Sequence, residues 1–112
     1  MIESYDFGKM VVDGRAYSAD LILLPDRINS SWWRQEGHKL SAADIQDVLA
    51  AEIEVLVIGT GFFGLMKVSS EVVQTAEAKG MQLVVEKTKT AVQRYNELAA
   101  RRRTAGAFHL TC

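Results

Sequence analysis

The chain has 112 residues, of which 48% are hydrophobic and 24% are charged, and its formal net charge is −1. These values indicate one compact domain and argue against nucleic acid or an anionic membrane as partner. The only cysteine is Cys112, which excludes an internal disulfide framework and a cysteine-based metal cluster, and we expect no cofactor and a cytoplasmic location.

We expect neither a signal peptide nor a membrane-spanning segment. An acidic residue, Glu3, stands close to the start, where a signal peptide would be basic and then apolar. The longest uncharged apolar stretch, residues 55–66, is too short and too rich in glycine to cross a bilayer.

A β-hairpin is expected at the start of the chain. Asp13-Gly14 favours positive φ at both central positions of a type I′ turn, and apolar residues alternate on either side of it. The pattern predicts strands over residues 5–12 and 15–24, the second ended by Pro25. Residues 26–40 show neither the strand period nor the helix period, and a loop of that length is often functional.

Three helices and three more strands follow. Ser41, with Asp44 three residues later, predicts the start of a helix with apolar positions up to Ile53. A second helix is expected over 71–79 and a third from its cap at Thr88 to the basic run 101–103. Strands are expected over 55–58, 82–86 and 107–111. The order ββαβαβαβ predicts a single α/β domain, residues 1–112, with a mixed sheet.

Residues 55–73 contain Gly59-x-Gly61-x-x-Gly64 directly after an apolar run, as dinucleotide-binding domains do. In such a domain the third glycine lies in the first helical turn, whereas here Leu65-Met66-Lys67-Val68 separates Gly64 from the next helix cap. We therefore expect a turn in which Gly59 and Gly61 adopt conformations closed to other residues.

Two aromatic pairs are candidate partner anchors. Phe62 and Phe63 lie at the tip of the glycine loop, and we favour burial in the core over exposure to a partner. Adjacent residues in an extended chain point opposite ways, so one of Trp32 and Trp33 is expected in the core and the other partly exposed. The alternative for the tryptophans is a binding hot spot flanked by Arg27 and Arg34.

No catalytic or metal-binding set is predicted. His38 has no second ligand nearby and is expected at the surface. His109 and Cys112 are three apart on a predicted strand and so face opposite sides, which leaves Cys112 buried and unreactive. The run 101–103 complements the dipole of the preceding helix and needs no phosphate.

Asn96 is a poor helix former in the middle of a helix, so its amide is expected to bond to something that offsets the cost. A hydrogen bond to a neighbouring loop, for example the glycine loop, is the interpretation we favour. In the alternative, Tyr95 and Asn96 form the polar wall of a small pocket.

Three motifs together point to a known family. They are Ile58-Gly59-x-Gly61, Thr88-x-x-Ala91-x-x-x-Tyr95-Asn96 and Phe108-His109-x-Thr111-Cys112. The chain resembles, over essentially its whole length, a family of small proteins of unknown biochemical function. That family includes the human adipogenesis-associated protein and, more distantly, a mitochondrial respiratory complex I assembly factor. The resemblance implies a three-layer α/β fold with a mixed central sheet and no established enzymatic activity.

The sequence differs from this family in two places. It lacks the N-terminal extension of the mitochondrial members, so their location does not transfer to it. The basic run 101–103 also stands where many relatives have a glycine-containing turn.

The leading functional hypothesis is a non-enzymatic interaction or assembly-type module that binds an unknown protein as a monomer or weak homodimer. The alternative is a binder of a small ligand or mononucleotide, with its site between the glycine loop and the last helix. The candidate residues of that site are Gly59, Thr60, Gly61, Thr88, Tyr95 and Asn96. An enzyme that uses His38, His109 or Cys112 is the least favoured hypothesis.

Overall fold

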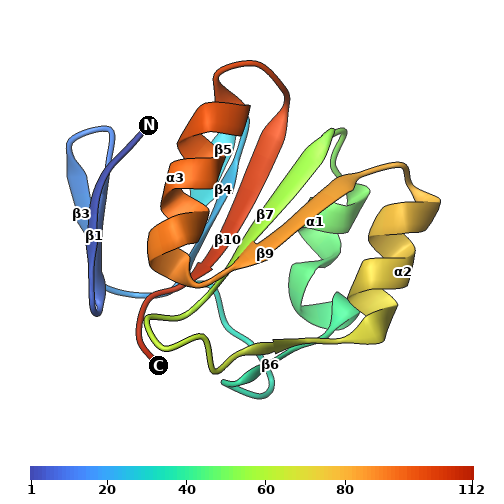
Figure 1. Cartoon of the computed structure of the whole chain (residues 1–112), viewed down its shortest axis with the longest axis horizontal. Helices are drawn as coiled ribbons and strands as arrows, with labels where there is room; N and C mark the ends of the chain where they lie inside the picture. The colour runs from blue at the N-terminus through green and yellow to red at the C-terminus, as the bar shows by residue number, and fades with distance from the viewer.

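A computed structural model describes all residues from 1 to 112. A five-stranded mixed sheet runs through the centre of the molecule (Figure 1). In spatial order its strands are β5 (Arg27–Asn29), β4 (Leu21–Leu24), β10 (Thr104–His109), β7 (Val55–Thr60) and β9 (Gln82–Glu86). Strands β10, β7 and β9 are parallel, while β4 is antiparallel to both β10 and β5. The predicted mixed sheet is confirmed.

The N-terminal residues form a second, three-stranded antiparallel sheet of β1 (Ile2–Asp6), β2 (Lys9–Val12) and β3 (Arg15–Tyr17). The predicted turn between β2 and β3 is confirmed, with φ of 49° at Asp13 and 81° at Gly14. Both predicted strands were too long. A second turn at Gly8, where φ is 76°, separates β1 from β2, and the chain passes from the small sheet to the large one between β3 and β4.

Helices cover both faces of the large sheet and give the expected three layers (Figure 1). Helix α3 (Thr88–Ala99) and the small sheet lie on one face. Helix α1 (Gln46–Ala50), which continues a 3-10 turn η1 (Ala42–Ile45), lies on the other face with α2 (Ser70–Ala78). The predicted fold class is therefore confirmed.

Each face of the sheet has its own apolar core, because successive residues of a strand point to opposite faces. On β7, Val55 and Val57 join the core beneath α3 and the small sheet, which we call the α3-side core. Leu56 and Ile58 join the core beneath α1 and α2, the α2-side core. Every residue of β7 and β10 is buried, so these strands belong to both cores.

Several predicted boundaries were wrong. The first helix ends at Ala50, before Ile53, and Lys87 rather than Thr88 is the N-cap of α3. Residues 26–40, expected to be irregular, contain β5 and also β6 (Lys39–Leu40), which pairs with β8 (Lys67–Val68).

The last strand covers residues 104–109 instead of 107–111, so Gly106 lies inside it. A Cβ atom at Gly106 would collide with the ring of Phe108 and would lie 2.9 Å from Tyr95. This glycine permits close packing of aromatic rings and lies within the strand, which had been expected to begin one residue later.

The longest helix, α3, has 12 residues, and none of the helices is both long and apolar enough to cross a membrane.

Candidate functional site

The predicted glycine loop follows β7 at the carboxyl end of the parallel strands and is fixed to the start of α3. The Gly61 N–H donates to the Thr88 hydroxyl at 2.9 Å, and that hydroxyl donates to the His109 carbonyl oxygen at 2.6 Å. The Thr60 hydroxyl donates to the Glu86 carbonyl oxygen at 3.2 Å. One buried threonine side chain, Thr88, thus joins the ends of β7 and β10 to α3.

The two glycines of this loop act by different means. Gly61 has a φ of +109°, which favours glycine, as expected. Gly59 does not have a positive φ, so that part of the expectation was wrong. A Cβ atom there would instead lie 2.8 Å from the Thr88 hydroxyl oxygen and 2.9 Å from the Phe108 ring. Thr88 and Phe108 therefore fill the space in which a ligand beside Gly59 would sit.

The loop does not lead directly into a helix. Helix α2 begins at Ser70, six residues after Gly64, and its N-cap is Ser69. A pyrophosphate at the loop would therefore not meet the N-terminal N–H groups of α2 as it does in a dinucleotide-binding domain.

Tyr95 and Asn96 lie two turns along α3 from Thr88. The Asn96 amide accepts a hydrogen bond from the Ile2 N–H at 2.9 Å and donates to the Ile2 carbonyl oxygen at 2.8 Å. Its partner is a strand of the small sheet and not the glycine loop. Asn96 thus takes the place of a neighbouring strand for one residue of β1.

The Tyr95 side chain reaches a different place. Its ring packs edge-on against Phe108, with centroids 5.7 Å apart, and its hydroxyl makes no hydrogen bond to the protein. Burial, and secondarily the charge of Asp13, raises the pKa of the Tyr95 phenol. Of the six candidate ligand residues, the structure brings Gly59, Thr60, Gly61 and Thr88 together and places Tyr95 and Asn96 elsewhere.

Phe62 and Phe63 do not plug the core, contrary to the favoured interpretation. They are 39% and 58% exposed, and they lie beside Phe7 (50% exposed) from the turn between β1 and β2. Ring centroids are 5.1 Å apart for Phe62 and Phe63, and 5.7 Å apart for Phe7 and Phe62. Leu65, on the same loop, is 47% exposed. We call these four residues the aromatic patch.

Backbone hydrogen bonds fix both segments that carry the aromatic patch. The Phe62 N–H donates to the Thr111 carbonyl oxygen at 2.7 Å, and the Leu65 N–H donates to that of Cys112 at 3.1 Å. The Leu110 carbonyl oxygen accepts from the Gly8 N–H and from the Tyr5 hydroxyl, each at 2.8 Å. The residues after β10 therefore hold the two segments side by side.

The tryptophans divide as predicted. Trp32 is 6% exposed, and its indole N–H donates to the Asp44 carbonyl oxygen at 2.9 Å, whereas Trp33 is 76% exposed. Arg34 does not flank an open hot spot, because it is buried with its guanidinium 4.6 Å from the centre of the Trp32 ring. Arg27 is exposed and pairs with Asp26 at 3.5 Å.

A largely buried polar cluster of Asp20, Arg34 and His109 was not predicted from the sequence. Asp20 Oδ2 lies 2.7 Å from His109 Nδ1 and 2.9 Å from Arg34 Nη1, while Asp20 Oδ1 accepts from the Leu110 N–H at 2.8 Å. Burial alone would raise the pKa of Asp20, but the hydrogen bonds from His109, Leu110 and Arg34 hold it below its usual value. An aspartate inside a predicted strand was the available signal, because strands are depleted in aspartate.

This cluster contains an imidazole oriented by a carboxylate, but no nucleophile faces it. His109 Nε2 is buried and has no hydrogen-bond partner, and the Thr88 hydroxyl donates to the His109 backbone. Cys112 lies beyond the end of β10 and is half-exposed, so its predicted burial in a strand was wrong. His38 is exposed, with its ring 6.0 Å from that of His109. The cluster ties the tryptophan segment to β4 and β10.

Comparison with known proteins gives one family and a set of similar folds. A family model described as a protein of unknown function (DUF498/DUF598) matches residues 2–109. A conserved hypothetical protein from Pyrococcus horikoshii is 26% identical with a TM-score of 0.85, over 100% of this chain and 99% of that one. A protein from Bordetella parapertussis is 28% identical with a TM-score of 0.74, over 96% and 92% of the two chains. A protein from Bartonella henselae, described as an outer membrane protein, is 26% identical with a TM-score of 0.83, over 99% and 94%.

Proposed function

This chain belongs to the DUF498/DUF598 family of proteins of unknown function, and we propose that it is a non-enzymatic interaction module that docks on a partner protein through the aromatic patch. The observation that carries the proposal is the exposure of Phe7, Phe62 and Phe63, whose rings pack against one another, together with the exposure of Leu65 on the same loop. Clustered large apolar side chains are uncommon on the surface of a monomer and are typical of protein interfaces.

The aromatic patch is suited to binding because it is already ordered. Each phenylalanine has only two side-chain torsions, and the hydrogen bonds to residues 110–112 fix the backbone that carries them. The aromatic patch would therefore lose little conformational entropy when a partner binds. Completing the burial of such side chains contributes about 1–3 kcal/mol each, which is the range of an interface hot spot.

The resemblance to an adipogenesis-associated protein and to a respiratory complex assembly factor supports a role in assembly. The free Cys112 and the absence of disulfides support a cytoplasmic location as part of this proposal. A small ligand between the glycine loop and α3 is the weaker candidate, because Thr88 and Phe108 occupy the space beside Gly59.

Site-specific photo-crosslinking tests the proposal. A photoreactive phenylalanine derivative replaces Phe63 in the full chain, and a matched control carries it at Trp33, which is exposed but outside the aromatic patch. We expect one protein to be captured in cells from position 63 and not from position 33. Phe7→Ser in the position-63 protein should reduce that capture at least tenfold while the chain remains folded.

Two results would overturn the proposal. One is a set of captured proteins that is the same from both positions. The other is a capture from position 63 that Phe7→Ser leaves unchanged. A crosslinked second copy of this chain supports the patch as the self-association surface, and mixing differently tagged copies identifies that case.

A further inference from the structure

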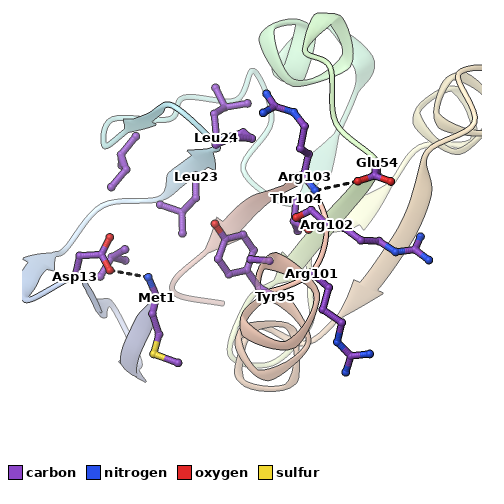
Figure 2. A pocket seen from close by; sticks show the side chains of 14 residues that line it. Met1, Asp13, Leu23, Leu24, Glu54, Tyr95, Arg101, Arg102, Arg103 and Thr104 are labelled. Atoms are coloured by element: carbon purple, nitrogen blue, oxygen red, sulfur yellow. Dashed lines mark hydrogen bonds and ion pairs between the residues drawn. The ribbon is translucent and has the colours of Figure 1, made fainter.

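A separate pocket (Figure 2) is lined by Glu54 and Thr104, at the amino ends of β7 and β10, which is the opposite end of the parallel strands from the aromatic patch. Its volume is about 520 Å³, which is within the range of small-molecule sites. The C-terminal end of α3, the start of β10, the turn between β4 and β5 and the turn between β2 and β3 enclose it. With Met1 and Glu54, which also line it, the pocket is built from five parts of the sequence: residue 1, residues 12–13, residues 23–28, residue 54 and residues 95–104.

Half of the residues that line this pocket are hydrophobic, and one polar side chain among them, Tyr95, has no hydrogen-bond partner in the protein. Val12, Leu23 and Leu24 supply the apolar surface. Figure 2 shows the Tyr95 phenol among these residues, with its oxygen directed toward Leu23. Because edge-on packing against Phe108 fixes the ring and no protein group bonds to the hydroxyl, the phenol can donate to a ligand or accept from it. Tyr5, another tyrosine of the α3-side core, differs from Tyr95 because its hydroxyl already donates to the Leu110 carbonyl oxygen.

The rim of the pocket carries an excess of positive charge. Arg101, Arg102 and Arg103 line it, and no carboxylate lies within ion-pair distance of any of the three guanidinium groups. The lining carboxylates have partners. Asp13 accepts from the terminal ammonium at 2.6 Å, and Glu54 accepts from the Arg103 N–H at 3.1 Å. The guanidinium groups extend outward from the rim in Figure 2.

The charge of a suitable ligand follows from the balance of positive and negative groups around the pocket. The carbonyl end of α3 contributes a partial negative charge of about half an electron, which three arginines exceed. Arg103 is held by a hydrogen bond from its Nε to the Glu52 carbonyl oxygen at 2.8 Å, whereas the guanidinium groups of Arg101 and Arg102 have no hydrogen-bond or ion-pair partner in the protein. A carboxylate there would meet flexible guanidinium groups, and an ammonium group would be repelled.

We propose that this pocket binds a small amphipathic carboxylate. Its apolar body lies against Val12, Leu23 and Leu24, a polar atom bonds to the Tyr95 hydroxyl, and the carboxylate pairs with Arg101 and Arg102. The inference is independent of the proposed docking surface, since none of the aromatic patch residues lines the pocket.

Titration with two probes that differ only in charge tests this assignment. Amide chemical shifts of the labelled chain are followed by NMR as 4-phenylbutyrate or 4-phenylbutylamine is added. We expect saturable binding of the carboxylate, with the largest shifts over residues 99–104 and 23–25, and binding of the amine at least about tenfold weaker, equivalent to about 1.4 kcal/mol. Three results would overturn the proposal. They are chemical-shift changes that do not saturate below about 5 mM carboxylate, equal binding of the two probes, and shift changes concentrated in other residues.

Matched variants then separate the contacts. Tyr95→Phe removes only the hydroxyl and should weaken carboxylate binding about 2–10-fold, whereas Tyr17→Phe, outside the pocket, should not. The double change Arg101→Gln and Arg102→Gln should weaken binding at least about fivefold and reduce its salt dependence, and Arg15→Gln should change neither. Phe63→Ser, which affects only the docking surface, should bind the carboxylate as the wild type does. Binding that survives both pocket changes would contradict the assignment.

Discussion

The side chain of Asn96 shows how one residue can fix a whole layer at a modest energetic cost. Asparagine is less favourable than alanine inside a helix by about 0.7 kcal/mol at most. In return its amide satisfies both backbone groups of Ile2, a strand residue 94 positions away in the sequence. Leaving buried backbone groups unpaired costs more than the propensity penalty, so the hydrogen bonds decide the residue at this position.

Asn96→Ala should therefore lower the free energy of unfolding by about 1–3 kcal/mol, after alanine's gain in helix propensity is included. Chemical denaturation measures the change, with Gln93→Ala as a control at an exposed position of the same helix. The variant should also speed hydrogen exchange of the Ile2 and Val12 amides. An unchanged or increased stability would show that the Ile2 groups do not depend on Asn96.

Asp20 gives the second prediction at this scale, and its sign follows from its lowered pKa. A carboxyl group with a lower pKa in the folded state stabilises the fold fully above its unfolded pKa, about 3.9, and loses that contribution as the pH falls. Asp20→Asn leaves Arg34 buried without its counter-charge, which costs about 3–5 kcal/mol near pH 7.

The difference in unfolding free energy between wild type and Asp20→Asn should be largest near neutral pH and should shrink below about pH 4. Urea denaturation at a series of pH values measures it. Asp47→Asn, at an exposed position on α1, should show a small difference, within about 0.5 kcal/mol, at neutral pH. A gap between wild type and Asp20→Asn that stays constant down to pH 3 would mean that Asp20 does not supply a stabilising charge.

At the scale of elements, the junction of β7, β10 and α3 depends on close approach at Gly59. The strand and the first turn of the helix come so near that a Cβ atom would lie 3.1 Å from the Thr88 Cα and closer still to the Thr88 hydroxyl. The same hydroxyl joins Gly61 to His109, so a shift of α3 would also disturb the glycine loop.

Gly59→Ala should destabilise the protein by about 1–3 kcal/mol through overpacking at this junction. Gly37→Ala is the matched control, because nothing lies within 4 Å of a Cβ atom there and the φ angle is not positive. Thermal and urea denaturation compare the two. Equal stability of both variants would show that α3 can move away from β7 without a loss of folding free energy.

At the scale of the whole molecule, the two cores share their central strands. Trp32 packs in the α2-side core, and all three tyrosines, Tyr5, Tyr17 and Tyr95, pack against the α3-side core. Because β7 and β10 contribute alternate residues to both cores, neither core can lose its strands while the other keeps them.

We expect the two cores to unfold together as a two-state unit. In a Trp33→Phe background the fluorescence of Trp32 reports on one core, and ¹⁹F signals of fluorotyrosine report on the other. The two denaturation curves should have the same midpoint and slope. A tyrosine transition at lower denaturant would mean that the small sheet unfolds first and is a separate unit.

The features that could be predicted from the sequence are those decided by neighbours along the chain. Asp13-Gly14 determines a turn because both residues tolerate positive φ. The β-branched run at β7 predicts a buried strand, and the β-branched run at β9 predicts a strand. The division of Trp32 and Trp33 between core and solvent follows from the geometry of extended backbone.

The remaining features depend on contacts between residues far apart in the sequence, and only the tertiary structure decided them. Asp20 lies just before β4 and joins His109, 89 positions later, while Gly106 stays within a strand because Phe108 and Tyr95 close over it. Phe62 and Phe63 are exposed because the residues after β10 hold their loop outside the core. The pocket beside Tyr95 likewise combines five distant parts of the chain, and no local pattern of residue types carries the information that they meet.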